Sequence, residues 1–345
     1  MHCVDLKLIN LMSLYAMMKD LIAAFPDHLE EGLKIAERAK WKNPAKRFKA
    51  VVITGLGGSG IGGSLAAEWM SASSHTPIFV NKDYYLPAFV DENTLVIASS
   101  YSGNTEETLA ALEQAIERKA EVAIITSGGR ALELATKHNF NAFVVEGGNP
   151  PRSMLGYSIT GLLSFLDFYG LKTPDYIASW KEAIAGMRKD IDAIHSQAKI
   201  YAEQLKNHCA VVYCTDGLAA MGERLRQQLN ENSKMLGWSS AIPEMNHNEL
   251  VGWAGGNQSF AVILLRSDFE YKRNAIRADI NKDILLKRTP TVLEWKAPGS
   301  SLISQSLYLN HLGDWVSYYL SEIHQVDIMD IKVIDFLKAE LGKIG

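Results

Sequence analysis

The sequence has few cysteines and no long uninterrupted apolar run. Cys3, Cys209 and Cys214 form no C-x-x-C pair and cannot all pair with one another, which indicates a reducing compartment. The N-terminal run "LINLMSLYAMMKDLIAAF" is broken by Lys19 and Asp20, so we interpret it as a buried helix rather than a secretion signal or membrane anchor. These two absences predict a cytoplasmic protein.

The sequence also lacks a basic patch and any metal-ligand spacing. Its formal net charge is −4 at pH 7, and its lysines and arginines do not cluster, so we expect neither nucleic acid nor membrane as a partner. The nine histidines form no H-x-H and no H-E-x-x-H, and no cysteine pair has the spacing of metal ligands. We therefore expect no metal and no other cofactor.

What the chain does contain is an alternation of strand-length apolar runs with helical patterns. At 345 residues, 47% of them hydrophobic, it can bury a large core and divide into two domains. The runs "AVVITGLG", "PIFVN", "TLVIASS", "EVAIITS" and "AFVV" are separated by amphipathic stretches such as "NTEETLAALEQAIERKA". This β-α-β order predicts an α/β fold with doubly wound, mainly parallel sheets and helices on both faces.

The second half of the chain repeats the first. "CAVVYCTDGLAAMGERL" aligns with "KAVVITGLGGSGIGGSL", and "SFAVILLRSDFEYKRNAIRADI" repeats the strand-then-helix form of "TLVIASSYSGNTEETLAALEQA". We therefore predict two similar domains with helical additions: a helical segment (1–48), a first domain (49–172), a helical connector (173–207), a second domain (208–325) and a C-terminal helix (326–345).

A glycine-rich stretch, "TGLGGSGIGGSL", follows the first apolar run. Gly55, Gly57 and Gly60 satisfy G-x-G-x-x-G, and Asp83 lies 23 residues after Gly60, as in a dinucleotide-binding fingerprint. The second copy replaces these glycines by "TDGLAAMGE", which does not suit a loop that needs positive φ angles. One copy therefore kept a phosphate loop and the other did not.

A second polar loop, "SSYSGNTEET", decides between a dinucleotide and a phosphate monoester. Ser100, Ser102 and Thr105 place three hydroxyl groups at a predicted helix start, where backbone N–H groups attract an anion. Taken alone, "SGNTEE" could equally be a plain helix N-cap with a capping-box acid and no role in binding. Because both loops follow strands of one parallel sheet, they can converge on one terminal phosphate. This arrangement favours a phosphate monoester over a dinucleotide.

These two loops resemble those of the sugar isomerase (SIS) domain family, whose members bind phosphosugars. The resemblance implies that each of the two predicted α/β domains is an SIS domain. It also implies that the sugar phosphate is held by hydroxyl groups and by the backbone beside them: Ser59, Ser100, Ser102, Thr105 and the Gly57–Gly58 peptide.

The doubled domain and three further segments narrow the resemblance. "NPPRSMLGYS", "LNENSK" and "PEMNHNELVGW" are similar to segments of the bifunctional phosphoglucose/phosphomannose isomerases of archaea and some bacteria, and the similarity extends over nearly the whole chain after about Phe48. It implies a metal-free isomerase that interconverts glucose 6-phosphate, and mannose 6-phosphate, with fructose 6-phosphate through a cis-enediol. Such a reaction needs a base near C2, a group that opens the ring, and a group that stabilises the enediolate.

The resemblance assigns these roles to particular residues. Glu231, which alone would be taken for a surface helical glutamate, becomes the base, and His247 becomes the ring-opening acid/base, supplied by the neighbouring subunit of a homodimer. Arg152, which with Pro151 begins a helix after "EGGN", would stabilise the enediolate. Lys338, in "DFLKAEL", would assist at the hydroxyl end of the substrate.

Two of these assignments leave alternatives. Where relatives often have a proline-rich stretch before the last helix, this chain has "DIMDIK", so Lys332 is the alternative to Lys338, and a solvated terminal lysine is a third reading. A histidine in a polar run is often only a structural hydrogen-bonding group.

Three other functions are consistent with part of the pattern. A non-catalytic sugar-phosphate-binding regulator would use the same phosphate loops, although we find no helix-turn-helix segment beside them. A nicotinamide-dependent oxidoreductase would explain "GLGGSG" but not "SYSGNTEET". An amidotransferase would need a glutaminase domain after Cys3, and the sequence has none of that length.

Overall fold

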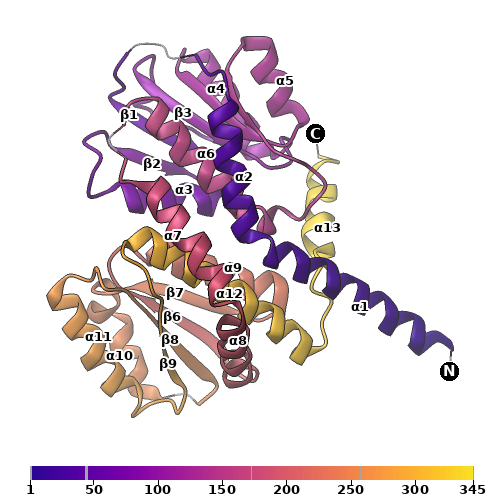
Figure 1. The fold of residues 1–345 in the computed structure, drawn as a ribbon, viewed down its shortest axis with the longest axis vertical. Helices are drawn as coiled ribbons and strands as arrows, with labels where there is room; N and C mark the ends of the chain where they lie inside the picture. Colours follow the sequence, from indigo (N-terminus) through magenta and orange to yellow (C-terminus); the bar gives the residue numbers. More distant parts are fainter. Residues whose placement is uncertain (1, 43–45, 172, 257, 345) are drawn as a thin grey trace.

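Two parallel β-sheets, one in each half of the chain, form the centre of the computed structural model, which describes residues 2–42, 46–171, 173–256 and 258–344, with side chains from Ser13 onward (Figure 1). The first sheet has the order β2-β1-β3-β4-β5 and the second the order β7-β6-β8-β9. All neighbouring strands are parallel. The strands are β1 (Ala50–Thr54), β2 (Ile78–Asn81), β3 (Thr94–Ser99), β4 (Glu121–Thr126), β5 (Asn141–Val144), β6 (Cys209–Cys214), β7 (Gly237–Ala241), β8 (Phe260–Arg266) and β9 (Val292–Lys296).

Helices connect these strands and cover the sheets. The α-helices are α1 (His2–Ala23), α2 (Phe25–Arg38), α3 (Gly57–Met70), α4 (Glu106–Glu117), α5 (Gly129–His138), α6 (Leu155–Phe168), α7 (Tyr176–Lys189), α8 (Ile191–Leu205), α9 (Ala219–Ser233), α10 (Glu249–Gly252), α11 (Lys272–Leu285), α12 (Leu302–His324) and α13 (Lys332–Leu341). Three 3₁₀ turns accompany them: η1 (Pro151–Ser153), η2 (Glu244–His247) and η3 (Trp253–Gly255).

Both sheets are covered on both faces because their strands alternate between two cores. In β1 and β3, Val51 and Leu95 belong to the core that includes α3 and α6, whereas Val52 and Val96 belong to the core under α4 and α5. In both sheets the second strand lies at the edge beside the first, and the third lies on the first strand's other side. The predicted α/β fold and its internal repeat are therefore confirmed, with the same switch point in each half.

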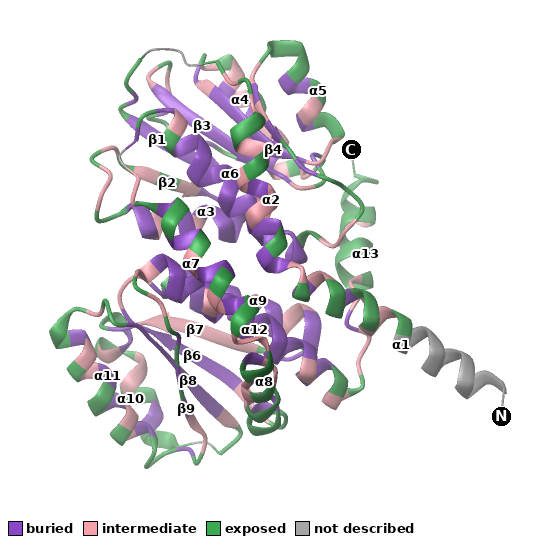
Figure 2. Cartoon of the chain, viewed as in Figure 1, coloured by how far each residue is buried: buried purple, intermediate pink, exposed green. Residues whose placement is uncertain are grey.

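The two halves share their largest core. Figure 2 shows α3, α6, α9 and α12 as mostly buried helices between the two sheets. Trp69 of α3 packs edge-to-face on Trp180 of α7 and donates a hydrogen bond to Ser306 of α12. A capping box formed by Ser301 and Ser304 begins α12. The halves are thus fixed to one another by apolar packing.

His311 lies at the centre of this core, on α12, and its side chain is fully buried. Its Nε2 atom accepts a hydrogen bond of 3.2 Å from Trp315 Nε1, and the ring of Phe25 stacks on it. Burial, with a smaller contribution from the charge of His195, lowers the pKa of His311 from 6.5 to about 3. The ring is therefore neutral at physiological pH and acts as a packed acceptor.

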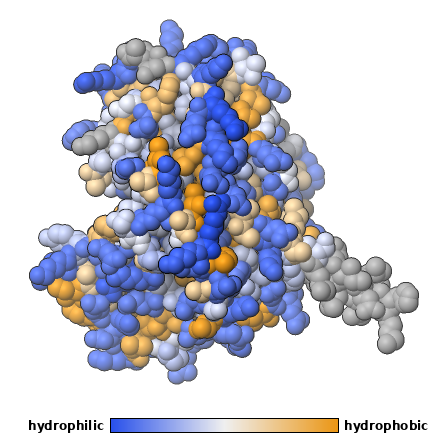
Figure 3. All heavy atoms as spheres, viewed as in Figure 1, coloured by the Kyte–Doolittle hydropathy of each residue, from blue (hydrophilic) through white to orange (hydrophobic). Residues whose placement is uncertain are grey.

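The N-terminal helices α1 and α2 differ in how closely they pack against the rest of the chain. Figure 3 shows hydrophilic residues as a stripe down the middle of the front face, where α2 lies in Figure 1; Lys34, Glu37 and Arg38 are exposed there. The N-terminal run is a helix, as predicted, but where its side chains are described, from Ser13 to Ala23, the prediction that it is buried is wrong. Figure 1 shows α1 projecting from the body, and in this part of α1 only Met18 and Ile22 are buried. The side chains of residues 8–12 lie outside the described ones. An apolar run of this length covers all sides of a helix, and in the described part only the side that carries Met18 and Ile22 is buried against this chain.

The C-terminal helix α13 contains no buried residue. Val333, Phe336 and Leu337 are 82%, 66% and 58% exposed, although they are large and apolar. In the part of the chain that the structure describes, none of the helices combines the length and apolar character needed to cross a membrane.

Candidate active site

The glycine-rich stretch forms the turn between β1 and α3. The helix begins at Gly57, whose φ of +54° favours glycine. A Cβ atom on Gly55 would lie 2.6 Å from the Ser99 carbonyl oxygen, and one on Gly60 would lie 2.5 Å from the Gly55 carbonyl oxygen. The glycines therefore allow the first N–H groups of α3 to lie directly against the end of β3.

The second polar loop lies at that same sheet edge, between β3 and α4. The Ser100 and Thr105 hydroxyls are hydrogen-bonded at 2.9 Å, and Gly103 between them has a φ of +70°. Thr105 is the N-cap residue of α4, but its side chain makes no capping bond. The plain N-cap reading is therefore wrong, because this hydroxyl is directed across the loop to Ser100 instead.

The two loops and the segment before α6 converge. Ser59 and Ser100 are buried, whereas Ser102 is exposed at the rim. A Cβ atom on Gly58 would lie 3.0 Å from the Pro151 carbonyl oxygen, so the start of α3 lies against η1. Neither α3 nor α4 has a side-chain cap at its N-terminus. Two uncapped helix starts with hydroxyl groups beside them form a site for a small anion.

Arg152 joins this anion site to the second half of the chain. Its side chain is 4% exposed, and it donates from Nε to Asn232 Oδ1 at 2.8 Å and from an Nη atom to the Ile328 carbonyl at 2.7 Å. Its other Nη atom lies 3.5 Å from Glu231 Oε2. Burial lowers the pKa of Arg152, and the Glu231 carboxylate opposes that shift.

Glu231 lies in the last turn of α9 with its side chain 32% exposed. Its neighbours fix the helix end: Asn232 donates to the Ser317 hydroxyl at 2.9 Å, and Ser233 donates to the Ser317 carbonyl at 2.8 Å. Lys234 then adopts a left-handed conformation (φ +53°) and donates to the carbonyls of Glu231 and Asp330. The side chain of Glu231 is thus one-third exposed, on a backbone that its neighbours fix.

A buried ion pair supports the backbone of Arg152 and the helix that carries Glu231. Arg224 of α9 donates to the Arg152 carbonyl at 2.8 Å and pairs with Asp314 of α12 at 3.1 Å. Gln228 and Asn310 also donate to Asp314, at 2.7 and 3.1 Å. Burial raises the pKa of Asp314, and Arg224 opposes this shift. A hydrogen-bonded network of this kind restricts its members to one geometry.

The structure brings together the phosphate loops, Arg152 and Glu231, but not the other two predicted groups. His247 is exposed in η2, after the edge strand β7, and among the described residues its ring makes no hydrogen bond. Lys338 and Lys332 lie on the exposed helix α13, where Lys332 pairs with Asp330 at 3.4 Å. Within the described chain, neither lysine makes a hydrogen bond or ion pair with Glu231 or Arg152.

Sequence reasoning missed two polar residues of the site, Asn232 and Lys234. Both stand in "LNENSK", the segment that pointed to Glu231, and their spacing within a helical turn could have indicated them. The Ile328 and Asp330 carbonyls left no such signal, since a backbone carbonyl has no side-chain signature.

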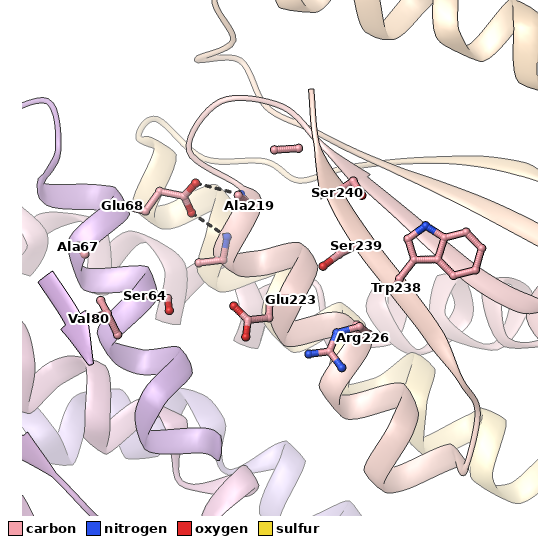
Figure 4. A pocket seen from close by; sticks show the side chains of 12 residues that line it. Ser64, Ala67, Glu68, Val80, Ala219, Glu223, Arg226, Trp238, Ser239 and Ser240 are labelled. Atoms are coloured by element: carbon pink, nitrogen blue, oxygen red, sulfur yellow. Dashed lines mark hydrogen bonds between the residues drawn. The ribbon is translucent and has the colours of Figure 1, made fainter. Parts of the chain in front are cut away.

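The start of α9 is the position in the second half that corresponds to the phosphate loop. There the Glu68 carboxylate, from the end of α3, accepts hydrogen bonds from the Ala219 and Ala220 N–H groups at 2.9 and 3.0 Å (Figure 4). Burial raises the pKa of Glu68, and these two N–H groups oppose the shift. A carboxylate of the chain itself therefore occupies this helix start.

A cleft of about 650 Å³ borders Glu68, between α3 and β2 on one side and α9 and β7 on the other (Figure 4). The two helices run antiparallel, since the start of α3 lies near the end of α9 through Pro151 and Arg152, and the end of α3 meets the start of α9. The cleft is therefore beside the opposite end of this helix pair from Glu231.

The chemistry that these groups can support is proton transfer beside an anion. Glu231 supplies a carboxylate, Arg152 a buried cation, and the two loops an anion site. In the described ranges, no group of three or more histidine, cysteine, aspartate or glutamate side chains is arranged to hold a metal ion.

Comparisons with known proteins match both halves of the chain. Residues 46–167 match the SIS domain family, and residues 194–341 match the family described as the bacterial phospho-glucose isomerase C-terminal SIS domain. A bifunctional phosphoglucose/phosphomannose isomerase from Caldicellulosiruptor bescii is 36% identical over 329 residues, covering 92% of this chain and 97% of the relative. One from Aquifex aeolicus is 36% identical over 325 residues, covering 91% and 99%.

A solved structure confirms the fold. The C-terminal domain of glucosamine-fructose-6-phosphate aminotransferase from Francisella tularensis is similar with a TM-score of 0.73, covering 90% of this chain and 97% of that one. The two sequences are 15% identical, so this likeness concerns the fold alone.

Proposed function

This chain belongs to the bifunctional phosphoglucose/phosphomannose isomerase family, and on that premise we propose that it interconverts glucose 6-phosphate and mannose 6-phosphate with fructose 6-phosphate. The reaction passes through a cis-enediol and uses no metal. One observation carries the proposal: the Glu231 carboxylate lies 3.5 Å from the buried Arg152 guanidinium, beside the sheet edge where both phosphate loops begin.

The phosphate group of the substrate binds at the starts of α3 and α4. Backbone N–H groups of Gly57 and Gly58 and the hydroxyls of Ser59, Ser100, Ser102 and Thr105 donate to its oxygens, and both helix dipoles favour its charge. This contact fixes one end of the sugar, so that C1 and C2 lie toward Arg152 and Glu231.

Glu231 acts as the base that moves the proton between C2 and C1. It removes the C2 proton of the open-chain aldose, and the returned proton at C1 gives the ketose. Arg152 stabilises the negative charge that develops on the enediolate oxygens, because its guanidinium is already desolvated and held by Asn232 and the Ile328 carbonyl. Pro151 sets the direction in which Arg152 enters the site.

A shared planar intermediate explains activity on both aldoses. Glucose 6-phosphate and mannose 6-phosphate differ at C2, and the enediol has no stereocentre there. One base can therefore serve both substrates if the sugar turns about the C2–C3 bond within the site.

Ring opening is assigned to His247 from a second subunit. Within its own chain the exposed ring has no hydrogen-bond partner among the described residues. A homodimer in which each subunit supplies His247 to the other's site accounts for this arrangement. Lys338 on the exposed helix α13 assists at the far hydroxyl groups, with Lys332 as the alternative. We place the enzyme in the cytoplasm.

The second candidate is a regulator that binds sugar phosphates without turning them over. The phosphate loops alone support it, since they need no base. Glu231 favours the isomerase, because phosphate binding alone does not need a carboxylate beside the anion site.

A coupled assay of fructose 6-phosphate formation, run with glucose 6-phosphate and with mannose 6-phosphate in the presence of EDTA, tests the proposal. Turnover of both substrates supports the metal-free dual isomerase. Turnover of glucose 6-phosphate alone removes the dual specificity, and turnover of neither with tight phosphosugar binding favours the regulator.

A further inference from the structure

We propose that Glu249 is a positioning residue that fixes the direction of His247 for ring opening. The inference rests on the proposed function, since it concerns the group to which that function assigns the sugar ring. Glu249 stands two residues after His247, in the short helix α10, and does not itself reach the site of its own chain.

The Glu249 carboxylate accepts hydrogen bonds from three side chains of the second sheet. Tyr213 of β6 donates to Oε1 at 2.7 Å, Trp238 Nε1 of β7 donates to the same oxygen, and Ser240 donates to Oε2 at 2.6 Å. The Asn248 side chain accepts from the Glu249 backbone N–H. Both oxygens of the carboxylate are therefore engaged, by the buried strand β6 and by its edge neighbour β7.

The three donors reach the Glu249 carboxylate from two neighbouring strands. Trp238 and Ser240 alternate with Ser239 along β7, and Figure 4 shows Ser239 directed toward α9 while the Trp238 indole lies on the other side of the strand. Tyr213 is fully buried and in turn accepts a 2.7 Å hydrogen bond from Trp253 Nε1. A core tyrosine and two residues of an edge strand thus converge on one carboxylate.

The chain on the other side of His247 is anchored as well. Met245 is buried, and Asn246 donates to Asn281 of α11 at 2.7 Å. His247 therefore lies between two fixed points, Asn246 and Glu249, while its own ring is exposed and makes no hydrogen bond in the described chain. Such a segment holds the backbone of an outward-facing imidazole still and leaves both ring nitrogens for another molecule.

These contacts also order the short segment that carries His247. The helix α10 has four residues, none of them buried, and of these Leu250 packs against the core of the second sheet. The hydrogen bonds to Glu249 add to this packing and offset part of the cost of ordering the segment. What the contacts secure is the direction of the neighbouring His247 side chain.

The two proposed steps can be measured apart, because ring opening interconverts the sugar anomers without any proton transfer at C2. Magnetisation-exchange NMR on glucose 6-phosphate gives the rate of anomer exchange above the spontaneous rate, and a coupled assay gives isomerisation. Glu231→Gln is expected to lose isomerisation and keep anomer exchange, and His247→Ala is expected to lose both.

Glu249→Gln is expected to follow His247→Ala, with both rates falling at least about tenfold, because a positioned acid/base supplies a factor of that size or more. Glu244→Gln is the matched control, since Glu244 is an exposed carboxylate in the same segment whose side chain accepts, among the described residues, a hydrogen bond only from Asn248. It is expected to keep both rates within twofold of the wild type.

Ser240→Ala and Trp238→Phe each remove one donor and give intermediate losses, and they keep the test decisive if Glu249→Gln does not fold. Anomer exchange at the wild-type rate in the folded Glu249 variant, or in both donor variants, would overturn the inference. A Glu249→Gln variant that loses isomerisation but keeps anomer exchange, as expected of Glu231→Gln, would also overturn it. A wild-type protein that performs neither reaction would instead overturn the proposed function itself.

Discussion

Replacing Glu231 by glutamine separates catalysis from stability at this site. The amide has nearly the shape of the carboxylate, but it cannot remove the C2 proton. General acid–base groups contribute roughly 10² to 10⁴ in rate, so kcat should fall by about that factor, which corresponds to about 3 to 5 kcal/mol of transition-state stabilisation.

The same change should affect folding little. Arg152 keeps its hydrogen bonds to Asn232 and to the Ile328 carbonyl, and it loses only an ion pair at 3.5 Å with a side chain that is one-third exposed. Solvent screens such a pair, so the free energy of unfolding should fall by no more than about 1 kcal/mol. Binding of a phosphosugar should persist, since the phosphate loops are untouched.

The assay is fructose 6-phosphate formation at saturating glucose 6-phosphate, paired with urea unfolding of the same preparations. Glu223→Gln is the matched control: it lies two turns earlier on α9 and pairs with Lys82 at 2.9 Å, at the cleft end of the helix. It should keep near-normal kcat. A Glu231→Gln variant with kcat within tenfold of the wild type would refute the assigned base, and a loss of stability as large as the loss of activity would refute the separation.

Three further changes test other parts of the structure. Gly103→Ala should lower the free energy of unfolding by about 2 to 4 kcal/mol in urea melts, because its Cβ would lie 1.8 Å from a carbonyl oxygen, whereas Gly148→Ala, with a similar φ and open space, should cost about 1. The pKa of His311 is about 3 when folded and 6.5 when unfolded, so its contribution to stability is complete above pH 6.5 and is lost as the pH falls toward 3. Between pH 7 and 4.5 the wild type should therefore lose about 2 to 3 kcal/mol more than His311→Gln, and equal losses would contradict the assignment. Mixing inactive Glu231→Gln and His247→Ala proteins should restore part of the activity, and no recovery after subunit exchange would exclude shared sites.

The sheets were largely predictable because their strands are continuous apolar runs. β1, β3, β4, β6 and β8 are buried along most of their length, so their sequences consist of residues such as "AVVIT" and "FAVILLR". β7, "GWSSA", was not predicted, since every residue of this edge strand is only half-buried. Its pairing with β6 comes from tertiary structure that no local pattern encodes.

The start of α3 is not evident from helix propensity. Glycines in its first turns argue against a helix there. The helix begins at Gly57 because Gly60, Gly62 and Gly63 lie against other parts of the chain, where a Cβ would meet atoms at 2.5 to 2.9 Å. Close packing therefore decided the helix boundary.

The candidate site was predictable where it is local in sequence. The hydroxyl groups of the "SSYSGNTEET" loop needed only one segment, and the structure brings Ser100 and Thr105 together. Arg152 and Glu231 lie far apart in the sequence, and only a family resemblance indicated both. The carbonyl of Ile328 and the donors to Glu249 could not be predicted, because they depend on how distant elements pack.

The Glu68 carboxylate at the start of α9 bears on how many substrate molecules one chain can hold. A chain made of two copies of a ligand-binding unit could bind two. Here a tethered anion already satisfies the second helix start, at an effective concentration that a dissolved phosphosugar at ordinary levels does not match. We therefore expect one chain to bind one phosphosugar, with the second copy supplying the proposed base, Glu231, to the site of the first.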